Sequence, residues 1–490
     1  MGLSCLFIKG LTMEKYKYYV NGQFCDIGVE IPVVNPFDGT QIASIIETPP
    51  EMLKSTLQTA RKAVDIWKKR SFKERSVILK EIEKIILDNL CELGHLETEE
   101  IGKAFKECLF VDISLGAQCF EYYASFLETL CEESISNRNG IDLLQYDPFG
   151  VVGVFLPYNV PIMSFGFTCA AALAAGNALI IKPSEFASLS ILKLIDLIKS
   201  LDIPKGLINV VTGKGETIGA ALAESEIDMI SFTGNRETLK KVVRNSAVNP
   251  KKIVAELGGA NISVLMDDAS LVDAVENVIA SAYMKQGQVC LGTSIALAHE
   301  SIYKKVKEML IVKTKKITLG DPNNPSTGIG PMTTKEHLDS TLLKIDKLKS
   351  IGGKVLCGGK VSENFPTILR PTLIEMEKIH YEEMFSPVLI LNSYKNDEEL
   401  RQILKSNPTA FAMQIWSENI NKAKMLADDI PCGTIWINSF VQMDMNTPTG
   451  GCKQSGWGRQ LGKYGFFEFV QIKHIGLNFK DTPVVGWFGV

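Results

Sequence analysis

One cysteine of this chain stands in a setting that suits a reactive thiol. Cys290 lies in the stretch KQGQVCLGTS, between Gly287 and Gly292 and after two amide side chains, Gln286 and Gln288. A thiolate held in a turn could act as a nucleophile in covalent catalysis. The chain has ten other cysteines, and a single cysteine is more often a small buried apolar residue than a nucleophile. The rest of the chain must therefore distinguish Cys290 from the others.

Two further residues could assist such a nucleophile. Glu256 ends an apolar run in AELGGANISV and is followed by Gly258 and Gly259. A carboxylate with an apolar approach can have a raised pKa and act as a base. Asn159 stands between two prolines in LPYNVPI, a rigid way to direct an amide NH₂ group at a developing negative charge. Glu256 precedes Cys290 by 34 residues, so the fold could bring both to one cleft.

Glycine-rich and charged motifs after two apolar runs could bind a nucleotide. TGKGETIG contains Gly213, Gly215 and Gly219, a spacing one residue longer than the usual dinucleotide motif. Such a turn would bring backbone close to a cofactor at a helix start. KPSE contains Lys182 and Glu185, which could both hydrogen-bond ribose hydroxyls. Taken alone, however, that spacing is better explained by a surface turn with a capping glutamate.

Composition indicates a globular protein of more than one domain. The chain has 490 residues, too many for one ordinary core, so two or three domains are expected. Hydrophobic residues make up 46% and charged residues 22%, and the net charge is −4. Because Lys and Arg are spread along the chain, we expect neither a nucleic-acid partner nor a membrane-binding face. No apolar run approaches the ~18 residues that a membrane helix needs.

Cysteine and histidine usage argues against a disulfide framework and against a metal site. The eleven cysteines are odd in number and irregularly spaced, and no CxxC occurs. This pattern predicts reduced thiols and a cytoplasmic location. The five histidines form no HExxH or other ligand spacing, so no catalytic metal is expected. The first residues fit neither a signal peptide nor a myristoylation signal. An alternative start upstream of Met13 is the plainer explanation for them.

Periodicity predicts the elements that must position these residues. Residues 50–106 have a helical pattern, with Ser71 and Glu74 as a capping box, and a second helical stretch covers 114–130. From residue 150 onward, short apolar runs that look like strands buried on both faces alternate with helical segments. The predicted strands cover 151–156, 178–182, 207–211, 229–233 and 261–266. This alternation predicts a parallel, doubly wound sheet of nucleotide-binding type.

A second succession of strands and helices follows from about residue 270 to 440. Two α/β domains in one chain imply a cleft between them, where ligands preferentially bind. Residues 135–150 look like a hairpin that interrupts the first pattern, and the C-terminal tail is apolar. We predict that both contact another subunit. The tail residues that would be costly to leave in water are Val484, Val485, Trp487, Phe488 and Val490.

Together, these motifs resemble those of the NAD(P)-dependent aldehyde dehydrogenases. In order along the chain, the landmarks are PYNVP, KPSE, GKGETIG, FTGN, ELGG, GQVC, EEMFSPV, IWIN and TGGCKQSGWGRQLG. The resemblance runs from VNPFDGT at 34–40 to GRQLGKYGFFEFVQIKH at 458–474. It implies an α/β fold: a Rossmann-like doubly wound cofactor domain, a second α/β catalytic domain and a small β oligomerisation element. The implied bounds are 13–129 and 149–258 for the NAD-binding domain, 259–456 for the catalytic domain, and 130–148 and 457–490 for the oligomerisation and bridging segments.

The resemblance also implies a role for each matching residue. Cys290 matches the catalytic thiol, Asn159 with the Cys290 backbone N–H matches the oxyanion hole, and Glu256 matches the base that activates the deacylating water. The positions that match the cofactor site are Lys182, Glu185, Gly213, Gly215, Gly219, Thr233, Gly234, Asn235, Leu257, Glu383 and Phe385. The positions that match the substrate channel are Tyr158, Val160, Phe167, Val289, Leu291, Val441, Met443 and Thr449.

The implied reaction is NAD(P)-dependent oxidation of an aldehyde to the carboxylic acid, through a cysteine thiohemiacetal and a thioester. Glu185 would accept a hydrogen bond from the ribose of NAD and repel the 2′-phosphate of NADP, so NAD is the expected cofactor and NADP the alternative. The matching channel is mostly apolar and has no evident arginine, so a neutral apolar aldehyde is expected rather than a dicarboxylate semialdehyde. The family also implies a homodimer or homotetramer.

Three other functions remain as alternatives. CoA-acylating aldehyde dehydrogenases are close relatives, but they usually lack the base that Glu256 would supply. A cysteine-dependent esterase or hydrolase would need a partner histidine, and no histidine here has a matching signature. A catalytically idle binding protein would not need Cys290, Glu256 and Asn159 intact.

Several positions depart from the family pattern. Lys285 stands where Asn is usual before QGQ, and Asn235 replaces the Ser of FTGS. Leu239 falls where a Gly often follows that motif. Tyr158 replaces the commoner Trp of PWNFP, and Ser386 replaces a Gly. None of these departures removes the core catalytic set, but they could rearrange cofactor contacts.

Overall fold

The computed structural model describes residues 14–479, and it begins with short strands. β1 (Glu14–Tyr16), β4 (Glu30–Val34) and β5 (Gln41–Ile46) form a three-stranded sheet. The hairpin of β2 (Tyr18–Val20) and β3 (Gln23–Cys25) extends a larger sheet, where β2 pairs antiparallel with a later strand. The sequence patterns had not predicted these strands, because each has six residues or fewer and so little periodicity to detect.

The predicted N-terminal helices are confirmed. The elements are α1 (Met52–Trp67), α2 (Phe72–Asp88), α3 (Leu90–Ile101), α4 (Phe105–Glu107), the π-helix η1 (Cys108–Ile113) and α5 (Ser114–Thr129). α2 begins at the predicted capping box. The Ser71 N–H donates to Glu74 Oε2 at 2.7 Å, and the Glu74 N–H donates to Ser71 Oγ at 3.3 Å. These two bonds satisfy donors that the first helical turn cannot satisfy within the helix.

The first large sheet has a parallel core that contains four of the five predicted strands. The predicted strand at 261–266 belongs instead to the second large sheet, and the strand Lys252–Glu256 had not been predicted. The parallel strands of the first large sheet are β8 (Val151–Phe155), β9 (Ala178–Lys182), β10 (Ile208–Val210), β11 (Met229–Thr233) and β12 (Lys252–Glu256). The intervening elements are α6 (Pro161–Phe165), η2 (Gly166–Ala170), α7 (Ala171–Ala175), α8 (Leu189–Ile198), η3 (Gly215–Gly219), α9 (Ala220–Glu224) and α10 (Arg236–Ser246). β8, β9 and β10 are buried along their whole length, which is typical of a sheet covered on both faces.

The order of this sheet creates a crevice at one edge. The strand β22 (Gly456–Trp457) starts the order β22-β12-β11-β8-β9-β10-β2-β3. From β8 the chain adds β9 and β10 on one side, and it then returns to add β11 and β12 on the other. Such a reversal leaves a ligand-binding crevice at the carboxyl ends of the two strands that flank it, here β8 and β11.

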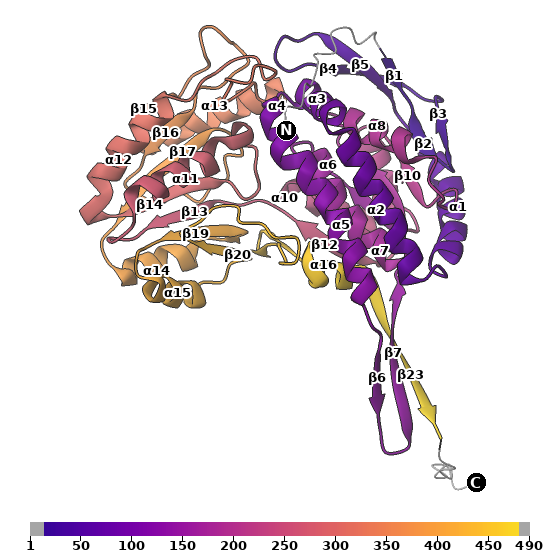
Figure 1. Cartoon of the computed structure of the whole chain (residues 1–490). Coiled ribbons are helices and arrows are strands. Elements are labelled where there is room, and N and C mark those ends of the chain that lie inside the picture. Colours follow the sequence, from indigo (N-terminus) through magenta and orange to yellow (C-terminus); the bar gives the residue numbers. More distant parts are fainter. Residues whose placement is uncertain (1–13, 480–490) are drawn as a thin grey trace.

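The second large sheet has the order β15-β16-β17-β14-β13-β19-β20, and all its pairs except β15–β16 are parallel. Its strands are β13 (Asn261–Leu265), β14 (Thr293–His299), β15 (Lys354–Cys357), β16 (Thr372–Glu375), β17 (Val388–Tyr394), β19 (Ala412–Trp416) and β20 (Thr434–Ile437). Its helices are α11 (Leu271–Tyr283), η4 (Met284–Gly287), α12 (Glu300–Lys315), α13 (Lys335–Ser350), α14 (Asp397–Ser406) and α15 (Ile420–Asp429). A two-stranded pair joins β18 (Thr409–Ala410) to β21 (Cys452–Lys453). Figure 1 shows the two large sheets with their helices as the two halves of the molecule.

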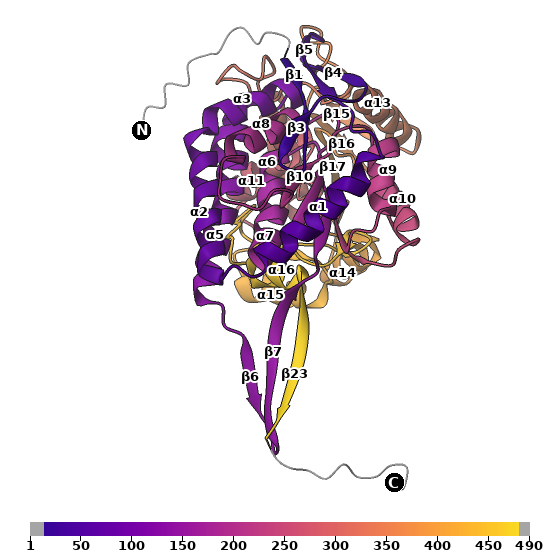
Figure 2. The same ribbon diagram turned by 90° about the vertical axis from the view of Figure 1, so that its right-hand side faces the viewer.

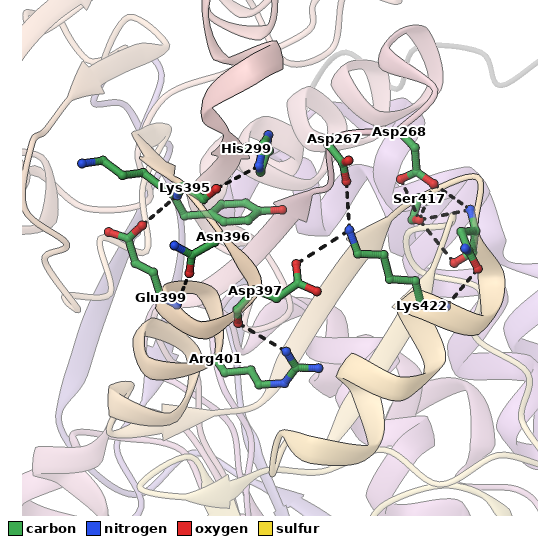
Figure 3. Close-up of polar contacts among 12 residues, drawn as sticks. Asp267, Asp268, His299, Lys395, Asn396, Asp397, Glu399, Arg401, Ser417 and Lys422 are labelled. Atoms are coloured by element: carbon green, nitrogen blue, oxygen red, sulfur yellow. Dashed lines mark hydrogen bonds and ion pairs between the residues drawn. The ribbon is translucent and has the colours of Figure 1, made fainter.

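Internal polar contacts close the carboxyl edge of the second sheet. Figure 3 shows Asp267 and Asp268, which follow β13, beside Ser417 and Lys422, which lie beyond β19. Ser417 Oγ donates to the Asp268 carboxylate at 2.8 Å, and Lys422 Nζ lies 3.0 Å from Asp267 Oδ1 and 3.7 Å from Asp397 Oδ1. These side chains therefore pair with one another at this edge.

The opposite, amino edge of the second sheet faces the first sheet. The chain leaves β12 at Glu256 and enters β13 at Asn261, so residues 257–260 connect the two sheets directly. The loop that carries Cys290 enters β14 at Thr293, which pairs with Asn261. The fold therefore sets the carboxyl edge of the first sheet against the amino edge of the second.

A further three-stranded sheet projects from the first half. The predicted hairpin at 135–150 is confirmed as β6 (Glu133–Ser136) and β7 (Gly140–Pro148), and β23 (Val470–Asn478) pairs with β7 along nine residues. α16 (Gly462–Glu468) precedes β23. Figures 1 and 2 show this sheet extending away from the helices in both views. The apolar tail residues Val484, Val485, Trp487, Phe488 and Val490 lie outside the described residues.

Two further properties concern the environment of the protein. Among residues 14–479, no helix has both the length and the apolar character that a membrane span requires. Nine cysteines in the same range are free thiols, as predicted. Cys91 is the exception, because it is disulfide-bonded, so the expectation of reduced thiols is wrong at that position.

Candidate active site

A cavity of about 1020 Å³ lies where the two sheet edges meet. The first half contributes residues at and beyond the carboxyl ends of β8, β9, β11 and β12, and the second half contributes the loop before β14 and the turn before β17. Cys290, Glu256 and Asn159 all lie on its wall, together with all eight residues predicted for the substrate channel. The structure thus brings to one cavity three residues that are far apart in the sequence.

The loop before Cys290 has an unusual backbone. Lys285, Gln286 and Gly287 have consecutive positive φ angles of 51°, 55° and 69°. Such angles are unfavourable for residues with a side chain, so surrounding contacts must stabilise them. The Lys285 N–H donates to Glu107 Oε1 at 2.9 Å, and Gln286 Nε2 donates to the Gly102 carbonyl. A Cβ atom at Gly287 would lie 2.2 Å from the Ser386 carbonyl oxygen, so only glycine fits there.

Two asparagines anchor the loop from both sides. Asn159 Nδ2 donates to the Gln288 carbonyl oxygen at 2.7 Å, which connects the end of β8 to the cysteine loop. Asn261 Nδ2 donates to the Cys290 carbonyl oxygen at 2.7 Å and to that of Gly292 at 3.0 Å. Sequence reasoning had not predicted a role for Asn261. Because an amide nitrogen carries two hydrogens, Asn159 retains one for another acceptor.

The surroundings of the Cys290 thiol favour its uncharged form. Burial raises the pKa of Cys290 to about 12, and the carboxylates of Glu383 and Glu256 add to the rise, while the Lys285 ammonium and the Leu291 N–H oppose it. Leu291, Phe411 and Trp436 belong to the apolar cluster against which Cys290 packs. A thiol in this environment is protonated near neutral pH, so its use as a nucleophile requires a base.

Glu256 is a buried carboxylate on the cavity wall. It is 3% exposed, and among the described residues neither of its carboxylate oxygens has a hydrogen-bond partner. Burial raises the pKa of Glu256 well above its ordinary value, although the nearby Arg459 guanidinium and Gly451 N–H act in the opposite direction. Gly450 comes so close that a Cβ atom there would lie 2.9 Å from Glu256 Oε1. An unpaired carboxylate with a raised pKa, on the wall of a cavity, is suited to proton transfer.

The other end of the cavity holds most of the residues predicted for the cofactor. Lys182 Nζ lies 3.0 Å from Glu185 Oε2. The pKa of Glu185 is lowered, because the Lys182 charge and several N–H donors outweigh the effect of burial. The cofactor-site residues on the wall are Lys182, Glu185, Gly215, Gly219, Thr233, Gly234, Asn235, Leu257, Glu383 and Phe385.

Gly213 is the one predicted cofactor residue that does not line the cavity. Its φ is +135°, and a Cβ atom there would lie 2.6 Å from Glu47 Cγ. Gly213 therefore serves the turn, where Glu47 accepts a hydrogen bond from the Lys214 N–H at 3.0 Å. Gly215, by contrast, has nothing within 4 Å of the position of a Cβ atom, so its backbone is open to a ligand.

Three departures from the family pattern have structural explanations. Asn235 caps α10, because its Oδ1 accepts a hydrogen bond from the Thr238 N–H at 2.8 Å. Leu239 is 4% exposed and packs in the core of the first half. Lys285 forms an ion pair with Asp112. Asn235 thus supplies the helix cap at this position, and Lys285 has a buried ion-pair partner.

A cluster of three rings stands at the junction of the two ends of the cavity. The Tyr158 hydroxyl lies 3.1 Å from His337 Nδ1, and Phe385 stacks on His337 with centroids 6.2 Å apart. Phe385 also meets Tyr158 edge to face at 6.1 Å. Burial lowers the pKa of His337 to about 4, so the imidazole is neutral at pH 7. No sequence motif had indicated His337, which lies in α13, far from every motif.

Glu383 lies beside this ring cluster. A Cβ atom at Gly258 would lie 1.8 Å from Glu383 Oε1, so the carboxylate fits only against glycine. Burial raises the pKa of Glu383 to about 7, against the opposing effects of the Gly259 N–H and of Lys344. Lys344 Nζ donates to the Glu383 carbonyl oxygen at 2.8 Å and fixes the turn. Other wall residues that the motifs had not indicated include Met163, Asn245, Thr334 and Phe411.

Comparisons with known proteins agree on one family. A sequence model described as the aldehyde dehydrogenase family matches residues 26–475. A betaine aldehyde dehydrogenase of Bacillus subtilis (strain 168) is 35% identical over 474 residues, which cover 93% of this chain and 95% of that protein. The crystal structure of PnpE in complex with nicotinamide adenine dinucleotide matches with a TM-score of 0.94 and 31% identity. This match covers 96% of the present chain and 99% of the PnpE chain. Betaine aldehyde dehydrogenase (betB) from Staphylococcus aureus, in complex with NAD⁺, has a TM-score of 0.93, 30% identity and 97% coverage of both chains.

Proposed function

Since this chain belongs to the aldehyde dehydrogenase family and is an oxidoreductase that acts on aldehydes, we propose that it oxidises its substrate to the carboxylic acid through covalent attachment to Cys290. The observation that carries the proposal is the convergence of Cys290, Asn159 and the unpartnered Glu256 carboxylate on one cavity wall. The acid is the expected product because a thioester can be hydrolysed where a base activates water.

In the proposed reaction, the Cys290 sulfur attacks the aldehyde carbonyl carbon and forms a thiohemiacetal. The free hydrogen of Asn159 Nδ2 and the Cys290 backbone N–H are the donors for its oxygen. Because burial raises the pKa of the thiol to about 12, a base must remove the proton, and Glu256 is the carboxylate best suited by its surroundings. Glu256 must release that proton to solvent before hydrolysis. The ionised Glu256 then takes a proton from water, which attacks the thioester carbon, expels the Cys290 thiolate and gives the carboxylic acid.

The residues at the other end of the cavity fit NAD. The open space beside Gly215 lets backbone approach a phosphate at the start of η3, and the ionised Glu185 can accept a hydrogen bond from a ribose hydroxyl. Glu383 and Phe385 would hold the nicotinamide ribose. When bound, NAD would supply the hydride acceptor for conversion of the thiohemiacetal into a thioester. The NAD complexes of PnpE and of the Staphylococcus aureus enzyme support this choice of cofactor.

We propose a neutral, apolar aldehyde as the preferred substrate. The channel wall is mostly apolar, with Val160, Phe167, Leu291 and Met443 among its residues, and no arginine lines the cavity in the described part of the chain. The cation nearest to the thiol loop, Lys285, is engaged with a carboxylate. A second carboxylate on the substrate would therefore lose its hydration without gaining a partner.

A cationic aldehyde is the second candidate. Tyr158, Phe167 and Phe411 line the cavity, and aromatic faces attract quaternary ammonium groups. The similar Bacillus subtilis and Staphylococcus aureus proteins are betaine aldehyde dehydrogenases by name.

An assay of NADH formation with an aldehyde panel tests both candidates. The panel contains hexanal, benzaldehyde, betaine aldehyde and succinate semialdehyde, each with NAD. We expect the highest kcat/KM with hexanal or benzaldehyde. A tenfold advantage of betaine aldehyde would establish the second candidate, and a tenfold advantage of succinate semialdehyde would exclude both. CoA-dependent product formation, with no free acid released, would point to the acylating alternative.

We also propose a homodimer or homotetramer in the cytoplasm. The projecting sheet of β6, β7 and β23 leaves strand edges open and exposes Ile135, Ile472 and Phe479. Open edges with exposed apolar side chains favour pairing with a second copy. Free thiols at nine positions support the location. Light scattering at micromolar concentration tests the assembly, and a monomer mass would exclude it.

A further inference from the structure

A chain of buried charges lies behind the wall that carries Cys290 and Asn159. Lys103 Nζ lies 2.6 Å from Glu97 Oε2 and 2.5 Å from Asp112 Oδ2, and all three side chains are 0% exposed. The second carboxylate oxygen of Asp112, Oδ1, pairs with Lys285 Nζ, whose side chain is 4% exposed. Two ammonium groups therefore share one buried carboxylate. Burying charges is costly unless each is paired, so the arrangement calls for a functional explanation.

This chain of charges connects the two segments that hold the proposed catalytic groups. Lys103 Nζ also donates to the Asn159 carbonyl oxygen at 3.2 Å, and Glu97 Oε1 accepts a hydrogen bond from the Ile162 N–H at 2.9 Å. At the other end, Lys285 belongs to the left-handed turn that leads to Cys290. The Asn159 segment and the cysteine loop are thus tied to the same buried carboxylate.

Lys285 also lies on the cavity wall with Cys290. Among the charged groups that act most on the thiol, Glu383 and Glu256 are negative and Lys285 is positive. The groups packed on Lys285 itself are Asp112 from η1 and Glu107 from α4, whose pKa burial raises to about 7. Cys290 also packs against the apolar cluster of Leu291, Phe411 and Trp436.

The geometry points to Lys285 as a positioning residue that places a fixed positive charge behind the thiol and so increases the reactivity of Cys290. Asp112 holds the ammonium group in place, and Lys103 in turn holds Asp112. The inference rests on the proposed role of Cys290. The family usually has Asn at position 285. Because a nearby positive charge favours the thiolate, the wild-type protein would reach a given thiolate fraction at a lower pH than a variant with a neutral residue at 285.

Alkylation of Cys290 by iodoacetamide tests this inference without substrate or cofactor. Only the thiolate reacts, so well below the thiol pKa the rate at a fixed pH is proportional to the thiolate fraction. Because nine cysteines among residues 14–479 are free thiols, the modified Cys290 peptide is quantified by mass spectrometry. Loss of a nearby opposite charge shifts a pKa by about one unit or more. Lys285→Met should therefore slow alkylation about tenfold between pH 7 and pH 9.

Three controls make the outcome decisive. Lys285→Asn removes the charge with the residue usual in the family, and it carries the test if Lys285→Met fails to fold. Lys285→Arg keeps the charge and should stay within about threefold of the wild-type rate. Lys106→Met removes an exposed lysine from α4 and should change nothing. Unfolding temperatures with and without NAD show that each variant is folded.

Two results would overturn the inference. One is a Cys290 alkylation rate equal to that of the wild type in folded Lys285→Met or Lys285→Asn. The other is a Lys285→Arg variant that is alkylated as slowly as these two, which would mean that the shape of the side chain matters and its charge does not. Failure of the proposed function has a different signature. If Cys290→Ala retained full turnover, Cys290 would not be the nucleophile, whatever the alkylation rates.

Discussion

The Tyr158 hydroxyl lies 3.1 Å from His337 Nδ1 although 179 residues separate the two in sequence. Tyr158 follows β8 in the first half, and His337 belongs to α13 in the second, so this contact bridges the cavity. The same hydroxyl lies 3.3 Å from Gln288 Oε1 in the cysteine loop. One phenol group therefore connects the end of β8, the cysteine loop and the helix beside the proposed nicotinamide site.

Replacing Tyr158 by Phe tests this bridge, because it removes the hydroxyl and keeps the ring. Without the hydroxyl, His337 and Phe385 would lose a contact that fixes the positions of their rings beside the proposed nicotinamide site. The loss of one net hydrogen bond, about 1 kcal/mol, should therefore weaken NAD binding about fivefold. Isothermal titration with NAD measures the effect. The matched control is Tyr303→Phe. Tyr303 lies on α12, and its hydroxyl donates to the Glu375 carboxylate at the end of β16. Equal NAD affinity in wild type and Tyr158→Phe would count against the bridge.

Cys290→Ala should abolish aldehyde oxidation and leave NAD binding near normal, because the thiol forms the covalent bond and does not hold the cofactor. NADH formation and the rise in unfolding temperature on NAD addition measure the two properties. Cys131→Ala removes an exposed thiol and should keep full activity. Turnover at the wild-type rate by Cys290→Ala would mean that another group is the nucleophile.

Glu256→Gln should reduce steady-state turnover by about 10²- to 10⁴-fold, the usual contribution of a general base. If thioester hydrolysis becomes limiting, acyl-enzyme should accumulate and rapid mixing should reveal a burst of NADH. Intact-protein mass spectrometry would detect the acylated Cys290. The exposed Glu226→Gln serves as the control. An unchanged steady rate without a burst would show that some other residue activates the water.

Glu185 should give the enzyme a preference for NAD. Its pKa is lowered by Lys182, so its carboxylate is ionised near neutral pH and repels a 2′-phosphate. Glu185→Gln should reduce the ratio of kcat/KM for NAD to that for NADP by about tenfold, which corresponds to ~1.4 kcal/mol. Steady-state kinetics with both cofactors measure this ratio. A wild-type enzyme that favours NADP would contradict the assignment.

Catalytic efficiency should rise with pH between pH 6 and pH 9. Burial raises the pKa of Glu256 above its ordinary value and that of Cys290 to about 12, so both lose protons only as the pH increases. The base form of Glu256 and the thiolate are the reactive species, so their fractions grow over this range. One limiting ionisation gives a slope of about tenfold per pH unit. A profile that falls from pH 6 to pH 9 would contradict these protonation states.

The sequence by itself determined the local elements and the inventory of reactive groups. Ser71 and Glu74 form a capping box within one helical turn, and the strand runs at 178–182 and 229–233 are mostly apolar and mostly buried. Such patterns depend on neighbours a few residues apart, so they are visible in the chain. The nine ordered motifs also indicated the family, which the comparisons confirmed.

Only the tertiary structure decided which groups meet. The ion pair of Lys285 with Asp112 joins residues 173 positions apart, and the His337 contact with Tyr158 joins two halves of the chain. The left-handed turn at 285–287 and the placement of Gly213 against Glu47 also depend on distant partners. Local propensity does not specify these contacts, because their stability comes from burial and charge pairing that exist only after both sheets have formed and packed edge against edge.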